Sequence, residues 1–408
     1  MPAVAINASG RAVIAWVQTG HKRSFLRARL GRVRGRSARV QTLSRTRPVY
    51  NPAVAVGADG TAAVIWLADG RHGTRLVQVA RAAPGRGFGA HRTLLRIRAN
   101  VTSDLVAIGR NGRVVAVWWA GVPRTGGHEI SYSLSGRSRA FSGPRTLAAA
   151  SLSSGDSIAA DGHGTIYVSW ATPVRQRNHQ AAVAALPAHA NTFGPPEVVS
   201  GHVGAEASLD AEADSPTLFT GAGGVALAYG VGGLLPNLLQ VGFRAPDGRF
   251  GPFRTAASVD VSDGTYYTGP VVALPAAAPA VAVWSVTSVD NPESQAPVSG
   301  DVEAATQRMD GSFEAPTRLS TPGALSQFPL AAAAGRTVIA VWGEGPYDRL
   351  RLRYSSRSPT GQFTSARPLS ADRADQPRLA SAGRYAVAAW VARARGRRAL
   401  RVAFLVAD

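Results

Sequence analysis

The sequence predicts an all-β protein, an eight-bladed β-propeller built from four-stranded antiparallel blades. Two observations carry this prediction. A phrase of two apolar runs joined by a small-residue turn recurs along the whole chain, as in NPAVAVGADGTAAVIW at 51–66. Each copy closes on an aromatic residue, and successive aromatics are 48 to 59 residues apart. A period near fifty residues is typical of solenoids and propellers.

The closing aromatics define eight units. They are Trp16, Trp66, Trp118, Trp170, Tyr229, Trp284, Trp342 and Trp390. In each unit the two β-rich runs around the turn indicate a hairpin, which supplies the first two strands. The first run consists almost entirely of small apolar residues, as the crowded innermost strand of a blade requires.

The second half of each unit also repeats. A polar loop leads into an alternating strand such as RLVQVARA (75–82), and then a phenylalanine is followed six positions later by an aliphatic residue. The pairs are Phe88 and Leu94, Phe141 and Leu147, Phe193 and Val199, Phe313 and Leu319, and Phe363 and Leu369, with Phe250 and Ala256 degenerate. Two further strands per unit complete the four that a propeller blade needs.

We therefore expect one domain, 1–408, with the blades following one another along the chain. The expected blades span about 1–49, 50–100, 101–153, 154–213, 214–267, 268–325, 326–374 and 375–408. The last unit ends after its third strand, so the last blade is expected to lack its outer strand. A segment upstream of Met1 is expected to supply that strand, together with a signal peptide.

The composition narrows the class of protein. Hydrophobic residues make up 45% of the chain and charged residues 17%, which argues against disorder. The absence of cysteine excludes disulfides, thiolate metal sites and a cysteine nucleophile. The longest apolar stretch, 270–284, is too short and too proline-broken to span a bilayer. We expect a monomer outside the cell or on its surface, with the cytoplasm as the alternative.

In its repeat architecture the whole chain resembles the bacterial propellers of the sialidase-like (BNR-type) superfold. The phrases closest to the Asp box of that superfold, S-x-D-x-G-x-T-W, are GADGTAAVIW (57–66) and AADGHGTIYVSW (159–170). Both place Asp and Gly between the first and second strands, with a different spacing. The resemblance therefore implies the fold, and no catalytic residue is carried over from it.

The residue that opens the first strand points to a candidate site. It is proline in five units (Pro2, Pro52, Pro216, Pro270 and Pro377) and Phe328 in unit 7. Units 3 and 4 have Asp104 and Asp156 instead, and we expect these carboxylates to face one another at the channel mouth. Such a pair suits Ca²⁺ or a sugar hydroxyl. The alternative is that each aspartate caps its own turn.

Loops on the same face add further candidates. The connections between second and third strands supply His128 and Glu129 in unit 3, and Arg175, Arg177, Asn178 and His179 in unit 4. Before the first strand of unit 6, the segment SDGTYYTGP carries Tyr266 and Tyr267. Exposed tyrosine pairs suit stacking on a sugar or peptide, and the alternative is packing against a neighbouring loop.

Charge is distributed unevenly around the expected ring. The chain has 45 basic and 25 acidic residues, a formal charge of +20, and only Lys22 is a lysine. A basic arc in units 1 and 8 includes the polyanion-binding candidates Arg23, Arg27, Arg29, Arg32, Arg34 and Arg36. Acidic residues gather in units 5 and 6, across the ring. No set of aromatics interleaves the arginines, so nucleic acid is not the expected partner.

The leading expectation is a non-catalytic propeller that recognises a glycan or a protein and requires no cofactor, with Ca²⁺ as the one ion considered. Two alternatives stay open. The first is a glycan-active hydrolase or lyase that uses a carboxylate and a tyrosine at the channel mouth. The second is a polyanion-binding scaffold that uses the basic arc, whose affinity would fall steeply with salt.

Overall fold

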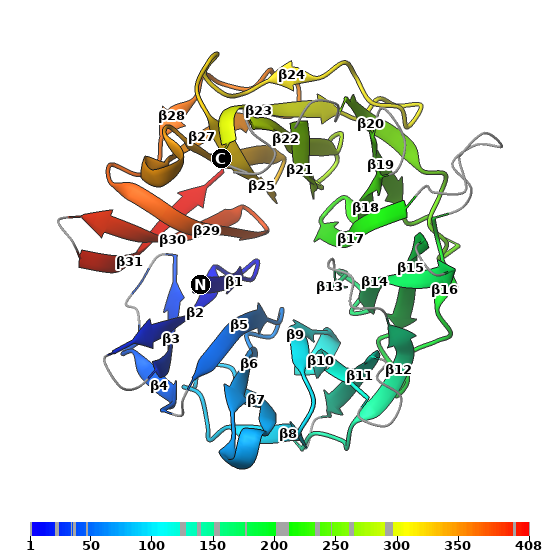
Figure 1. The fold of residues 1–408 in the computed structure, drawn as a ribbon, viewed down its shortest axis with the longest axis vertical. Coiled ribbons are helices and arrows are strands. Elements are labelled where there is room, and N and C mark those ends of the chain that lie inside the picture. Colours follow the sequence, from blue (N-terminus) through cyan, green and yellow to red (C-terminus); the bar gives the residue numbers. More distant parts are fainter. Residues whose placement is uncertain are drawn as a thin grey trace.

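The computed structural model confirms the eight-bladed propeller (Figure 1). It describes residues 2–20, 24–33, 35, 38–45, 48–122, 128–136, 140–150, 156–175, 178–200, 212–232, 237–245, 247–260, 265–289, 297–394 and 397–407. Seven sheets have four strands and the eighth has three, and in every sheet consecutive strands are neighbours. The last blade thus lacks an outer strand among the described residues, as expected.

The strands of the first four blades follow the chain in order. Blade 1 holds β1 (Pro2–Ile6), β2 (Arg11–Thr19), β3 (Ser24–Arg32) and β4 (Gln41–Ser44). Blade 2 holds β5 (Val49–Val56), β6 (Ala62–Asp69), β7 (Arg75–Ala82) and β8 (Arg92–Ile97). Blade 3 holds β9 (Val101–Ile108), β10 (Val114–Gly121), β11 (His128–Ser135) and β12 (Arg145–Ala150). Blade 4 holds β13 (Ser157–Ala160), β14 (Ile166–Arg175), β15 (Asn178–Leu186) and β16 (Glu197–Val198).

The second half of the ring repeats the plan. Blade 5 holds β17 (Glu212–Gly221), β18 (Gly224–Gly232), β19 (Asn237–Phe243) and β20 (Arg254–Val259). Blade 6 holds β21 (Thr265–Ala273), β22 (Val281–Val289), β23 (Pro297–Thr306) and β24 (Thr317–Arg318). Blade 7 holds β25 (Ser326–Ala334), β26 (Thr337–Glu344), β27 (Arg351–Arg357) and β28 (Arg367–Pro368). Blade 8 holds β29 (Arg373–Ala382), β30 (Tyr385–Ala394) and β31 (Arg397–Val406).

The core lies between the blades. The second strand of each blade is buried on both faces, as in β6, because neighbouring blades cover it from either side. Trp66 packs against Leu26 and Leu43 of blade 1, and Trp342 packs against Val302 and Leu319 of blade 6. The closing aromatics of blades 2 to 8 thus fill the space beside the outer strands of the preceding blade. Seven of the eight are at most 6% exposed, and Trp16 is the half-buried exception.

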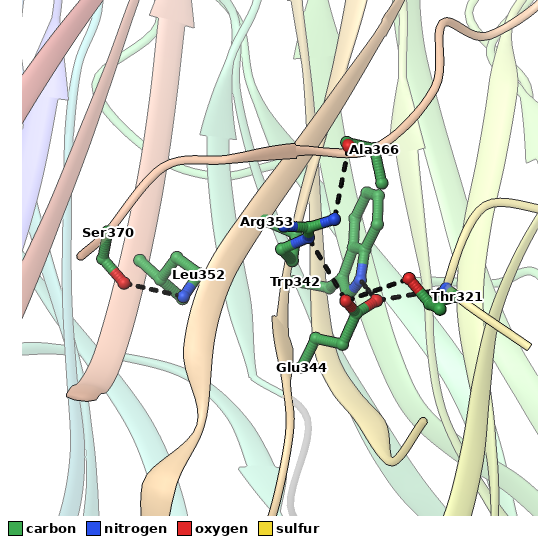
Figure 2. A network of polar contacts seen from close by, with 7 residues as sticks. All are labelled: Thr321, Trp342, Glu344, Leu352, Arg353, Ala366 and Ser370. Atoms are coloured by element: carbon green, nitrogen blue, oxygen red, sulfur yellow. Dashed lines mark hydrogen bonds and ion pairs between the residues drawn. The ribbon is translucent and has the colours of Figure 1, made fainter. Parts of the chain in front are cut away.

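Polar side chains link the strands where apolar packing ends. In blade 7, Glu344 accepts hydrogen bonds from the Trp342 indole (3.2 Å) and from the Thr321 backbone N–H (3.1 Å), and forms an ion pair with Arg353 (3.2 Å) (Figure 2). Thr321 belongs to the connection from blade 6, so the Glu344 carboxylate of blade 7 links the two blades by hydrogen bonds.

Most innermost strands bend near their start. Five of them carry a β-bulge there, with a residue at positive φ followed by proline. The pairs are Asn51-Pro52, Ser215-Pro216, Gly269-Pro270, Phe328-Pro329 and Gln376-Pro377, with φ of +43°, +50°, +112°, +55° and +54° at the first residue. Pro329 therefore takes the strand-opening place in blade 7 that the sequence analysis gave to Phe328. The turn that follows is one residue shorter in blade 7 than in blades 1 to 4 and 6, so counting fourteen residues back from Trp342 reaches Phe328 instead of Pro329.

Blade 8 packs against blade 1 and closes the ring (Figure 1). Their shared core is small: Ile6, Ala12 and Val387 are its buried members. Helical structure in the described part of the chain is confined to short 3₁₀ turns such as Arg71–Gly73, and none of its helices has the length and apolarity to cross a membrane.

Candidate functional site

The innermost strands begin on one face of the ring, here called the top face. The connections from second to third strands also lie there, because alternate strands run in opposite directions. The bulges just described lie at this end of the innermost strands, so their left-handed residues are exposed or half-buried on the top face. A ligand that approaches the channel mouth meets these residues first.

One group on this face joins two blades. The Gln327 side-chain N–H donates to the hydroxyl of Tyr266 at 3.2 Å, linking β25 to β21. Gln327 is buried, at 3% exposed, whereas Tyr266 is 39% and Phe328 45% exposed. These three residues, called here the aromatic–amide cluster, present two accessible rings, one of which carries the hydroxyl that Gln327 holds. Because Gln327 donates, Tyr266 keeps its own hydroxyl proton for another acceptor.

The two tyrosines of the predicted pair separate. They lie within β21, where successive side chains point to opposite faces. Tyr266 reaches blade 7. Tyr267 packs toward blade 5, where its hydroxyl lies against the backbone of Gly230. There is no room for a side chain at Gly230, because a Cβ there would lie only 1.8 Å from the hydroxyl oxygen of Tyr267. Tyr267 therefore fills a space between blades, and the stacking pair expected from the sequence is not formed.

Asp104 is a buried acid. It lies opposite Trp118 in the β9–β10 register, is 5% exposed, and its Oδ2 has no hydrogen-bond partner. Its place in the strand puts it on the same face as Val106 and Ile108, which pack against blade 2. Burial without a charged partner raises the pKa of this carboxyl well above its ordinary value.

Asp156 occupies the corresponding place in blade 4, directly before β13, and is half-buried. The two aspartates thus start neighbouring innermost strands, but Asp104 is turned toward blade 2 and away from Asp156. Among the residues that the structure describes, no group of three or more histidine, aspartate or glutamate side chains is placed to hold a metal ion. Calcium binding at this pair stays a prediction.

The other predicted residues of blades 3 and 4 are dispersed. Glu129 accepts hydrogen bonds from Ser131 (3.1 Å) and Thr146 (3.3 Å), so its carboxylate faces the outer strands. His128 and His179 are half-buried at the starts of β11 and β15. Arg175 and Asn178 end β14 and begin β15, and Arg177 lies outside the described residues.

The basic arc of blade 1 is only partly described. Arg27 donates to Thr42 at 3.1 Å, Arg29 donates to the Ala38 carbonyl at 3.1 Å, and Arg32 is exposed at the end of β3. Arg23, Arg34 and Arg36 lie outside the described residues. Of the six candidate arginines, three are described, and two of these make hydrogen bonds within their own blade.

Several other carboxylates close to the top face are engaged by neighbours. Asp69 pairs with Arg75 and accepts from Tyr50, and Asp375 pairs with both Arg373 and Arg393. Asp301 pairs with Arg318 at 2.9 Å, and Glu303 accepts from the Trp284 indole at 3.1 Å. Burial raises the pKa of Glu303. These groups hold strands together.

Sequence reasoning missed Gln327 and Phe328 as site residues. In the sequence Phe328 only interrupts the series of strand-opening prolines, which does not mark it as a site residue. Counting back thirteen residues from Trp342, the distance found in blades 5 and 8, reaches Pro329 and marks Phe328 as the bulge residue. Nothing in the linear sequence signals Gln327, because its partner lies 61 positions away on another blade.

Comparison with known proteins supports the architecture. No family model and no curated protein matches the chain. Among solved structures, polysaccharide lyase Uly1 is similar, with a TM-score of 0.54 at 9% identity over 87% of this chain and 90% of that one. A PL25 ulvan lyase bound to -[GlcA(1-4)Rha3S]- has a TM-score of 0.48 at 10% identity over 98% and 91%. An endo-arabinase from Bacteroides thetaiotaomicron has a TM-score of 0.35 at 12% identity over 63% and 95%.

These comparisons correct two expectations. The leading expectation, a non-catalytic binding propeller, and the accompanying view that an enzyme is the less favoured reading are both corrected, because the similar structure of Uly1 is that of a polysaccharide lyase. At such low identity the likeness itself shows the fold alone: an all-β, eight-bladed propeller of four-stranded blades.

Proposed function

We propose that this protein is a glycan-active enzyme that cleaves an acidic polysaccharide by β-elimination at the top face. The observation that carries the proposal is the aromatic–amide cluster. The Tyr266 hydroxyl is held by the Gln327 amide at 3.2 Å, and the rings of Tyr266 and Phe328 are both accessible to a sugar chain. A positioned tyrosine with a proton to give is a suitable group for general acid–base catalysis.

Elimination needs few protein groups. Water acting as the base removes the C5 proton of a uronate, the C4–O bond breaks, and Tyr266 gives its proton to the leaving oxygen. The proton held by the water then returns to the Tyr266 phenolate. The products are an unsaturated uronate and a shortened chain, with no water consumed. In this scheme Tyr266 is the general acid that donates a proton to the leaving oxygen, and Phe328 stacks on a neighbouring sugar. Gln327 is a positioning residue, since it acts through the phenol.

The carboxylates favour elimination over hydrolysis. A glycosidase uses two carboxyl groups on opposite sides of the scissile bond. In the described part of the chain, Asp69, Asp301, Glu303 and Asp375 are bonded to neighbours, and Asp104 is buried within a blade interface. Tyrosine-based proton transfer does not need a free carboxylate pair.

An anionic substrate suits the charge of the molecule. The formal charge is +20, and Arg378 lies on β29, the innermost strand of the blade next to Phe328. Burial lowers the pKa of the Arg378 guanidinium from its ordinary value. A partly desolvated arginine gains more from a carboxylate or sulfate ligand than one in open solvent.

The finer identity belongs to the same proposal. The chain is proposed to be a monomeric bacterial protein of sialidase-like type that acts at or outside the cell surface, where acidic polysaccharides are met. Ca²⁺ is proposed as a structural ion at most, since the elimination described above does not require it and Asp104 is turned into a blade interface, away from Asp156.

Three variants test the role of the cluster. Tyr266→Phe removes only the hydroxyl and is expected to lower kcat by about a hundredfold or more while KM stays near wild type. Gln327→Leu leaves the phenol unheld and should lower kcat less. Tyr267→Phe, on the same strand, is the matched control and should retain activity. Equal activity of Tyr266→Phe and wild type on an acidic polysaccharide that wild type cleaves would overturn the proposal.

A further inference from the structure

Three buried hydroxyl groups lie where blades 6 and 7 meet, toward the top-face ends of their strands. Ser285 and Thr287 of β22 and Ser326 of β25 are 0%, 1% and 0% exposed. None of their hydroxyl oxygens has a hydrogen-bond partner among the residues that the structure describes. These three residues are called here the hydroxyl cluster. A buried hydroxyl is costly unless it is hydrogen-bonded, so the cluster needs a partner.

The strand register places the cluster beside the Tyr266 side chain. Ser285 and Thr287 continue the row of Val281 and Val283 along one face of β22, and those two valines pack against blade 7. Thr287 lies opposite Tyr266 in the β21–β22 register, so both side chains are on the face that meets blade 7.

Gly300 shows how closely blade 7 approaches this face. It lies opposite Thr287 in the β22–β23 register and forms a bridge with Leu325, directly before β25. A Cβ at Gly300 would lie 3.3 Å from Thr287 Oγ1 and 2.8 Å from the Ser326 carbonyl oxygen. Thr287 and Ser326 therefore border the same point from two blades, and Gln327 follows Ser326 directly.

A further buried oxygen next to the cluster is Gln327 Oε1. The Gln327 Nε2 donates to the Tyr266 hydroxyl at 3.2 Å, while Oε1 has no hydrogen-bond partner within the described ranges. If the amide were reversed, Oε1 would accept from the Tyr266 hydroxyl and engage the proton that the phenol otherwise keeps. A donor to Oε1 therefore decides whether Tyr266 has a proton to give.

A water molecule meets the needs of all these oxygens. Ser285 and Thr287 are two positions apart on one face of a strand, a separation of about 6.6 Å. That separation is too long for a direct hydrogen bond and suits a bridging water. Buried waters bind where several polar groups otherwise lack partners. A cation fits less well, because the four oxygens are uncharged and would not repay its loss of hydration.

We propose that a buried water molecule, bound by the hydroxyl cluster, donates a hydrogen bond to Gln327 Oε1 and thereby fixes the amide with its N–H toward Tyr266. Thr287 and Ser326 are then positioning residues, because they act on the phenol through the water and Gln327. The catalytic role of this water rests on the proposed function, whereas its binding does not.

Variants of Thr287 test the positioning role. Thr287→Val removes the hydroxyl and keeps the shape, so it should lower kcat about tenfold with KM unchanged on an acidic polysaccharide that wild type cleaves. Thr287→Ser keeps the hydroxyl and should restore most of kcat. Thr265→Val removes a hydroxyl on the other face of β21, bonded to Ser288 at 3.3 Å, and as the matched control should retain activity. An unchanged kcat in Thr287→Val, where Tyr266→Phe is impaired, would overturn the positioning role.

A high-resolution crystal structure tests the water without any substrate, so its outcome is separate from that of the proposed function. We expect an ordered water within hydrogen-bonding distance of Gln327 Oε1 and of at least two cluster hydroxyls, and its loss in Thr287→Val. Direct bonds between Gln327 and the hydroxyls, without water, would overturn the proposal. A thermal midpoint that differs between sodium, potassium and choline chloride at equal ionic strength, in wild type but not in Thr287→Val, would also overturn it, by making a cation the occupant.

Discussion

At the scale of single residues, Asp104 illustrates how one replacement changes the chemistry of a repeated position. Six blades place proline at the start of the innermost strand, where its missing N–H breaks no ladder bond. Asp104 takes the same place in blade 3 and is buried opposite Trp118 with one carboxyl oxygen unpartnered. A buried acid of this kind is stable in its protonated form and costly when ionised.

This predicts a pH dependence of stability. Folding raises the pKa of Asp104, so at neutral pH the native state holds a proton that the unfolded chain has released. The free energy of unfolding therefore falls as the pH rises above the pKa that Asp104 has in the unfolded chain. Asp104→Asn should remove this loss and stabilise the protein by about 1 to 3 kcal/mol at neutral pH, with less gain in acid. Thermal unfolding of both proteins across pH measures it.

Asp310 gives a control of opposite sign. Hydrogen bonds from Ser312 lower the pKa of this exposed carboxyl, so its contribution is present at neutral pH and is lost in acid. Asp310→Asn should not stabilise the protein at neutral pH. If Asp104→Asn raises the free energy of unfolding no more at neutral pH than in acid, the argument from the burial of Asp104 is wrong.

At the scale of elements, the bulges on the innermost strands place side chains on the top face at a conformational cost. Phe328 and Gln376 adopt φ near +55°, a region that L residues other than glycine seldom occupy. Blade 6 uses Gly269 at the same place. Strain of this kind persists where the side chain has a use, and Phe328 is part of the aromatic–amide cluster.

Replacing Gln376 with glycine should therefore stabilise the protein. The left-handed conformation costs glycine nothing, so we expect a gain of about 1 kcal/mol from Gln376→Gly, measured by chemical denaturation. Gln376→Ala keeps the strained backbone and serves as the control. A gain of the same size from alanine would show that the effect comes from the lost side chain instead.

The strands and blades also show which features of the fold can be predicted from the sequence. The repeat predicted the blades, the innermost position of the small apolar strands and the missing outer strand of blade 8, because each depends on local pattern. It treated Tyr266 and Tyr267 as a loop pair, although they lie in a strand that sends them to opposite blades. The bond between Tyr266 and Gln327 could not be predicted, since it depends on how neighbouring blades are rotated against each other.

At the scale of the whole molecule, the described residues give the interface between blades 8 and 1 the smallest apolar core. The core between blades 8 and 1 has three buried members, whereas the one between blades 1 and 2 has fifteen. Burial of apolar area is the main source of stability in such interfaces. Opening of the native ring is therefore expected to start where blade 8 meets blade 1.

Hydrogen–deuterium exchange followed by mass spectrometry tests this expectation. Peptides from β31, β1 and β2 should exchange faster than the corresponding peptides from β7, β5 and β6, because local opening exposes them first. If the seam peptides exchange no faster than those of blade 2, the ring opens elsewhere or as a unit.

The central claim, that the top face cleaves an acidic glycan by elimination, is tested most directly by the products. The purified protein would be incubated with uronate-containing polysaccharides, and the fragments would be weighed by mass spectrometry with their ultraviolet absorbance recorded. Elimination predicts fragments lighter by one water than hydrolysis products and a new absorbance from the C4–C5 double bond, both forming about a hundredfold more slowly with Tyr266→Phe. Fragments of hydrolytic mass, or intact polymer throughout, would contradict the account.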